Sequence, residues 1–195
     1  MILRKFLVVM LVVSVNMFSQ TEVDDILVAD STWTKEKIRL PFHFAPEIKY
    51  EGYEDIRFAK GWGNIESPEF WTYTFVWNIN LKERPKPVFF EENLMFYFDG
   101  LMNLVNKEKE KIIPKTQVKI YSRKEKNKTN FYRGTLVLHD SFKTKNTILL
   151  YVDIESKLCK KTKNYICLFR FSRQPFQHST WKKLNKVKIK KNFCN

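Results

Sequence analysis

The sequence predicts an α+β domain in which one long amphipathic helix packs on a mainly antiparallel sheet of about five or six strands. Two periodic stretches lead to this prediction. Large apolar side chains alternate with smaller or polar ones over 71–80, the two-residue period of a strand. Apolar residues then recur every three or four positions over 88–109, the period of a helix. A sheet wrapped around one helix, as in cystatin-like or NTF2-like folds, is one concrete version by analogy.

The N-terminus has the layout of a signal peptide. Arg4 and Lys5 precede an almost uninterrupted apolar run over 6–15, and the small residue Ser19 follows at a plausible cleavage point. The apolar run is shorter than the roughly 20 residues that a membrane-spanning helix needs. We therefore expect a signal peptide over 1–19, a secreted or periplasmic location, and no transmembrane span once the signal is removed.

The chain after the signal divides into an arm and a domain. Residues 20–32 are acidic and rich in small side chains, which predicts a flexible arm. Residues 33–195 have the length of a single α+β domain. Within it, 33–62 is aromatic and is expected to be irregular, because Pro41 and Pro46 remove the backbone donors that a central strand needs.

The regular elements follow in order. The strand at 71–80 is stopped by Pro85 and Pro87, and the helix at 88–109 comes next. Gly100 inside that helix costs about 1 kcal/mol relative to alanine, which indicates a close packing contact. Polar turns then separate short strands, as expected of antiparallel neighbours. These strands are predicted at 117–123, 131–139, 147–154, 165–172 and 187–193.

The chain has three cysteines, and export places them in an oxidising compartment where one disulfide and one free thiol are expected. Cys159 and Cys167 flank a polar turn and could face each other across a hairpin, so this is the preferred pair. Pairings with Cys194 and three free thiols remain open. The spacing matches no zinc motif, and we expect neither a metal nor a cofactor.

The candidate site lies in the aromatic and acidic segment between His43 and Trp77. Its rings could stack on a sugar or a peptide while carboxylates and a guanidinium orient the ligand. The candidate binding residues are Glu54, Arg57, Trp62, Glu69 and Trp71. The alternative is that these aromatics close the open end of the core.

Catalysis is the rival interpretation of the same segment. A carboxylate pair within 47–69, such as Glu54 with Glu69, could act as acid and base on a glycan if held about 5–9 Å apart. No nucleophile-elbow, zinc-protease or phosphate-loop motif occurs in the sequence. We therefore assign no catalytic residue and favour a non-catalytic protein.

The net charge of +14 is unevenly distributed along the chain. Residues 20–100 carry 9 basic against 15 acidic residues, whereas residues 101–195 carry 24 against 6. No acidic residue follows Glu155. The densest basic run, headed by Trp181, consists of Lys182, Lys183, Lys186, Lys188, Lys190 and Lys191.

Such a basic field attracts anionic polymers or surfaces. For an exported protein we expect an anionic glycan, lipopolysaccharide or an acidic protein as the partner, and not nucleic acid. Two alternatives are that the lysines are only solvated surface, and that the protein is a structural envelope-maintenance component. The sequence makes no prediction about its oligomeric state.

Four segments carry a resemblance to a known group of proteins. They read LPFHFAPEI at 40–48, GYEDIRF at 52–58, GWG at 61–63 and FWTY at 70–73. Together they resemble an uncharacterised family of secreted proteins from Gram-negative, Bacteroidetes-type bacteria, over about residues 33–105. The resemblance implies export from a Gram-negative cell and transfers no activity and no catalytic residue.

Overall fold

The computed structural model describes residues 24–107, 112–123, 126 and 128–194. The predicted signal peptide, 1–19, lies outside the described residues. The predicted α+β class is confirmed, although its main helix is shorter than expected, with 19 residues packed on a large antiparallel sheet. In chain order the elements are β1 (Leu27–Val28), β2 (Thr34–Leu40), β3 (Gly52–Phe58), β4 (Tyr73–Ile79), α1 (Pro87–Val105), β5 (Gln117–Ser122), β6 (Asn130–His139), β7 (Thr147–Leu158), β8 (Tyr165–Ser172), α2 (Thr180–Leu184) and β9 (Lys188–Ile189).

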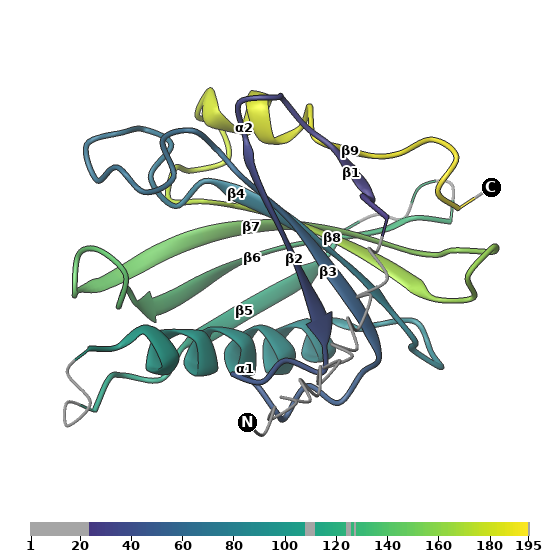
Figure 1. The fold of residues 1–195 in the computed structure, drawn as a ribbon, viewed down its shortest axis with the longest axis horizontal. Coiled ribbons are helices and arrows are strands. Elements are labelled where there is room, and N and C mark those ends of the chain that lie inside the picture. The colour runs from purple at the N-terminus through teal and green to yellow at the C-terminus, as the bar shows by residue number, and fades with distance from the viewer. Residues whose placement is uncertain (1–23, 108–111, 124–125, 127, 195) are drawn as a thin grey trace, which may run out of the picture.

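The molecule has three layers, with the large sheet in the middle (Figure 1). Seven strands form that sheet in the order β2-β3-β4-β8-β7-β6-β5, and every neighbouring pair is antiparallel. Helix α1 packs on one face, and the outer layer of α2, β1 and β9 lies over the other. The central strand β4 is therefore buried along its whole length. Among the described residues no helix is long and apolar enough to cross a membrane.

Helix α1 ends four residues earlier than predicted, at Val105 instead of 109. The amide of Asn106 caps it by donating to the carbonyl of Asn103. The close contact predicted at Gly100 is confirmed, because a Cβ there would lie 1.9 Å from the Phe44 carbonyl oxygen. This glycine lets the helix lie directly against the loop after β2.

The segment 33–62, predicted to be irregular, contains β2 and β3, and this raises the strand number above the five or six expected. Strand β2 is an edge strand whose side chains are mostly charged and exposed, so it lacks an alternating apolar pattern. Strand β3 buries Glu54, Asp55 and Arg57, and these charged residues interrupt the pattern from which a strand is predicted.

The predicted Cys159–Cys167 disulfide is wrong, because Cys159 is bonded to Cys194 and Cys167 is free and buried. The register of the β7–β8 hairpin gives the reason. Leu158 faces Tyr165, and Cys167 therefore faces Ser156, three positions away from Cys159. The disulfide instead ties the C-terminal end of the chain to the end of strand β7.

The outer layer is held on the sheet by two buried arginines. The Asp55 carboxylate accepts the backbone amides of Ile26 and Leu27, and Arg57 pairs with Asp55. Part of the expected arm, 20–32, thus forms β1 and pairs with β9. Arg170 of β8 donates to the carbonyls of Leu184 and Val187, at 3.1 and 3.2 Å. The last strand, predicted over 187–193, is reduced to β9.

Candidate functional site

Two tryptophans are brought together by the loop between β3 and β4. The amide of Trp62 donates to Ala59, and the amide of Trp71 donates back to the carbonyl of Trp62 at 3.1 Å. Trp71 has a φ of 57°, a left-handed conformation that turns the chain into β4. The two indole rings lie 5.8 Å apart, centre to centre. The loop thus places Trp62 and Trp71, two of the predicted binding residues, next to each other.

A second turn, between β6 and β7, adds an aromatic ring to this pair. The Asp140 carboxylate accepts the backbone amides of Phe142, Lys143 and Thr144, and this network fixes the turn. The Phe142 ring consequently lies 5.7 Å from Trp62 and 5.9 Å from Trp71. Phe142 was missed at the sequence level, because its distance from the tryptophans along the chain gives no local signal.

These rings line a cavity of about 310 Å³ between the sheet and α1, which we call the aromatic cavity. Its walls come from β2, β3, β4, α1 and the two loops. The lining residues are Glu36, Ile38, Ile56, Phe58, Trp62, Trp71, Tyr73, Tyr97, Leu101, Val105 and Phe142. Trp71 and Tyr73 are almost fully buried, whereas Glu36 is exposed and places its carboxylate at the mouth. The arrangement is suited to holding an apolar group.

Glu54 lies in the core next to this cavity and not on its lining. Its carboxyl accepts the indole N–H of Trp77 at 2.5 Å and the hydroxyl of Tyr97 at 3.0 Å. Burial removes the carboxyl from water and raises the pKa of Glu54 to about 8. Tyr97 lines the cavity and donates a hydrogen bond to Glu54. The predicted residue Glu54 therefore contacts the cavity only indirectly, by holding the side chain of Tyr97 in place.

Arg57 points to the opposite face of the sheet. Side chains alternate along β3, so Ile56 and Phe58 line the aromatic cavity while Asp55 and Arg57 face the outer layer. Arg57 donates to the Asp55 carboxylate and lies 3.6 Å from Asp25. The structure therefore separates Arg57 from Trp62 and Trp71, and gives it a role in anchoring β1.

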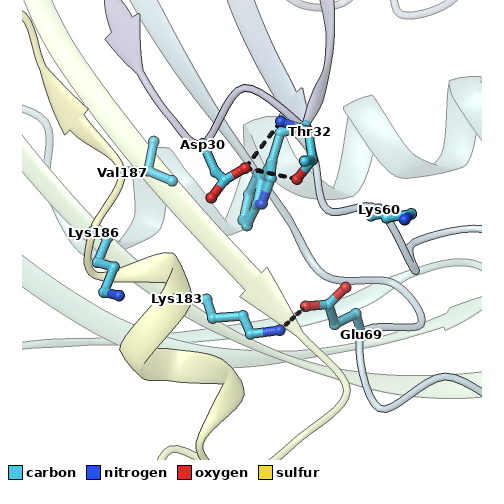
Figure 2. Close-up of a pocket in the computed structure, with 8 residues that line it drawn as sticks. Asp30, Thr32, Lys60, Glu69, Lys183, Lys186 and Val187 are labelled. Carbon is cyan, nitrogen blue, oxygen red and sulfur yellow. Dashed lines mark hydrogen bonds and ion pairs between the residues drawn. The ribbon is translucent and has the colours of Figure 1, made fainter.

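Glu69 lines a second pocket, of about 270 Å³, under the outer layer (Figure 2). It accepts the amide of Gly61 at 3.1 Å and pairs with Lys183 at 2.5 Å. The hydrogen bond from Lys183 lowers the pKa of Glu69. The other lining residues are Asp30, Thr32, Trp33, Lys60, Lys186 and Val187.

Glu54 and Glu69 thus have different surroundings and share no partner. Glu54 is enclosed by Trp77 and Tyr97 in the core, and Glu69 pairs with Lys183 in the second pocket. Among the described residues, no hydrogen bond or common partner joins them as the acid–base pair of a glycan hydrolase. Within the described part of the chain, no group of three or more histidine, cysteine, aspartate or glutamate residues is placed to hold a metal ion.

All six lysines of the predicted basic run are exposed, and together they form what we call the lysine track. The track follows α2, β9 and the C-terminal segment along the outer layer (Figure 1). Lys183 and Lys186 line the second pocket, where Figure 2 shows Lys183 reaching Glu69. Lys188 lines a third pocket, of about 190 Å³, together with Glu155, Lys157 and Arg170.

The disulfide lengthens this basic surface. The Cα atoms of Cys159 and Cys194 are 5.0 Å apart, so the turn after β7 lies beside the end of the track. That turn carries Lys160, Lys161 and Lys163, which are all exposed. This extension was not predicted from the sequence, because Cys159 was expected to pair with Cys167 and not with Cys194 at the end of the track.

Comparison of the chain with models of known protein families, with curated proteins and with solved structures finds no match.

Proposed function

We propose that this is a non-catalytic binding protein, exported from its cell, whose lysine track binds a linear anionic glycan of the cell envelope. The observation that carries the proposal is that six exposed lysines follow one continuous stretch of the outer layer, 182–191. The signal-peptide pattern and the resemblance to secreted Gram-negative proteins support the location.

The backbone under the track is anchored, which favours binding. Arg170 fixes the carbonyls of Leu184 and Val187, β9 pairs with β1, and Cys194 is bonded to Cys159. Lysines on an anchored backbone lose only side-chain freedom when they bind, and the cost of ordering a loop is avoided. The backbone positions that carry the track's charges are therefore fixed on the surface.

A polymer fits the track better than a small anion. The second pocket combines Lys60, Lys183 and Lys186 with Asp30 and Glu69, and a single anion there would have to compete with the Lys183–Glu69 pair. A linear glycan that carries many charges contacts the lysines over the whole length of the track. Exposed charges interact through water, so this binding is expected to weaken as salt is added.

Retention on immobilised heparin, a linear sulfated glycan, tests the proposal. Replacement of the six track lysines by glutamine should lower the salt concentration of elution by roughly half or more, because the charges that would contact the glycan along the track are removed. The matched control replaces six other exposed lysines, which gives the same change in net charge. That control set is Lys49, Lys82, Lys86, Lys107, Lys115 and Lys119.

Two outcomes overturn the proposal. Equal elution of the track variant and the control variant would mean that only net charge matters. Binding of the wild-type protein to vesicles of anionic lipid, together with no retention on heparin, would assign the lysines to a membrane surface. A lower elution salt for the track variant alone supports the proposal.

A further inference from the structure

We infer that the aromatic cavity is a binding site for an uncharged, apolar small molecule. This goes beyond the proposed function, because the cavity is lined by residues of α1 and of the sheet face that α1 covers. The lysine track lies on the outer layer, which covers the opposite face of the sheet (Figure 1). The two sites are on opposite faces of the sheet, so each can fail without affecting the other.

The size of the cavity indicates the size of its ligand. A cavity of about 150 Å³ lined by apolar side chains binds one benzene. The aromatic cavity is about 310 Å³, or roughly twice that volume. It accommodates two linked rings or a hydrocarbon chain of about ten carbons.

The lining indicates an apolar ligand. The rings of Phe58, Trp62, Trp71, Tyr73 and Phe142 form much of the lining. Leucine, isoleucine and valine side chains from α1, β2 and β3 complete it. A space enclosed by such groups is poorly suited to water, since water needs two to four polar partners. Most of the affinity is therefore expected from buried apolar surface.

One polar atom at the cavity has no partner. Trp62 lines the cavity, and its indole nitrogen is buried without a hydrogen bond to any described residue. An unsatisfied buried donor of this kind destabilises the protein, because it has lost its hydrogen bonds to water without gaining another partner. A ligand with one neutral acceptor, such as a carbonyl or ether oxygen, would satisfy it.

The charges disfavour ions in the cavity. The Glu36 carboxylate at the mouth repels an anionic ligand such as a fatty carboxylate. A cation must approach a protein with a net charge of +14 and then leave water for a mainly apolar lining. An uncharged ligand meets neither obstacle.

A matched pair of fluorescent probes tests this inference. N-phenyl-1-naphthylamine is uncharged, and 8-anilino-1-naphthalenesulfonate has the same rings with one sulfonate. The uncharged probe should bind at one saturable site, and at least about tenfold more tightly than the sulfonate, because of Glu36 and the cost of desolvating the charge. Glu36→Gln should narrow this difference, and Glu66→Gln, at an exposed residue outside the lining, should leave it unchanged.

Filling the cavity supplies the second part of the test. Leu101→Trp places a larger side chain in the lining and should weaken the uncharged probe at least about tenfold. Leu104→Trp, at an exposed position on the same helix, should leave its affinity unchanged. If Leu101→Trp fails to fold by circular dichroism, Val105→Phe serves in its place, with Val88→Phe as its control.

Three results would overturn the inference. They are probe binding without saturation, equal binding to Leu101→Trp or Val105→Phe and to the wild-type protein, and tighter binding of the cation 1-naphthylmethylammonium than of the uncharged probe. Weaker binding of the uncharged probe to the cavity variants, with unchanged binding to the control variants, supports the inference.

Discussion

Glu54 shows how a single buried carboxyl makes folding depend on pH. Its ordinary pKa is 4.5, and burial raises the pKa in the folded protein to about 8. Between these values the folded state holds one more proton than the unfolded state. The free energy of unfolding therefore falls as pH rises, by about 1.4 kcal/mol per pH unit. The protonated Glu54 contributes its full stabilisation below about pH 4.5. This contribution is lost as the pH rises through about 8.

Glu54→Gln should remove this dependence. The amide resembles the protonated carboxyl, can accept the indole N–H of Trp77 and can pair with the hydroxyl of Tyr97. Between pH 6 and pH 9, the free energy of unfolding measured in urea should fall by about 2–4 kcal/mol more for the wild-type protein than for the variant. Glu83→Gln, at an exposed position, is the control and should behave like the wild-type protein. Parallel pH profiles for wild type and Glu54→Gln would contradict the prediction.

Cys167 is expected to be an inert thiol. Burial raises its pKa to about 12, and only the thiolate reacts with disulfide reagents. A thiol reagent should detect no group in the folded protein and one group in urea, since the other two cysteines form the disulfide. Detection of a thiol in the folded protein would contradict its burial.

At the scale of the residue, the sequence indicated which side chains are present but not which of them meet. The alternation along β3 was hidden, because Glu54, Asp55 and Arg57 are buried where apolar residues are expected. Each is satisfied by partners far away in the chain, such as Tyr97 for Glu54 and the amide of Ile26 for Asp55. Sequence periodicity contains no information about these partners.

At the scale of the element, the disulfide stabilises the segment that forms most of the outer layer. It closes a loop of 35 residues that contains β8, α2 and β9. Closing a loop of this length is expected to contribute about 3–4 kcal/mol by restricting the unfolded chain. Cys194→Ser should lower the free energy of unfolding by that amount, as measured by urea denaturation.

The other cysteines supply the controls for this change. Cys159→Ser should cost as much as Cys194→Ser, and the double variant should cost little more than either, because all three lack the same bond. The free energy of unfolding of Cys167→Ser should still fall when reductant is added, because this variant retains the Cys159–Cys194 bond. If Cys194→Ser matched the stability of the wild-type protein, the assigned disulfide would be wrong.

At the scale of the element, strands with regular apolar patterns were predicted well. The range 165–172 agrees with β8, and 131–139 and 147–154 agree with β6 and β7 within one to four residues at their ends. Strand β2 was missed because its exposed side chains are charged, and α2 was missed because it is only five residues long. Short or charged elements depend on tertiary contacts that a sequence window does not contain.

At the scale of the whole molecule, the α+β class followed from composition and periodicity, but the third layer did not. The two ends of the described chain meet as β1 and β9, which are separated by about 160 residues in the sequence. No local pattern predicts such a contact. The uneven charge along the chain was visible in the sequence, and the structure places its densest lysine run on the outer layer.

The position of the disulfide also determines how this protein would carry mechanical tension. A force applied at residue 194 passes through the bond directly to Cys159 at the end of β7. The covalent loop between them, which includes β8, α2 and β9, is then bypassed by the load. In the reduced protein the same force would act on the Arg170 anchors and on the β1–β9 pair. The lysine track from 182 to 191 lies within the protected loop, so in the oxidised protein this surface stays in place when the C-terminal end is pulled.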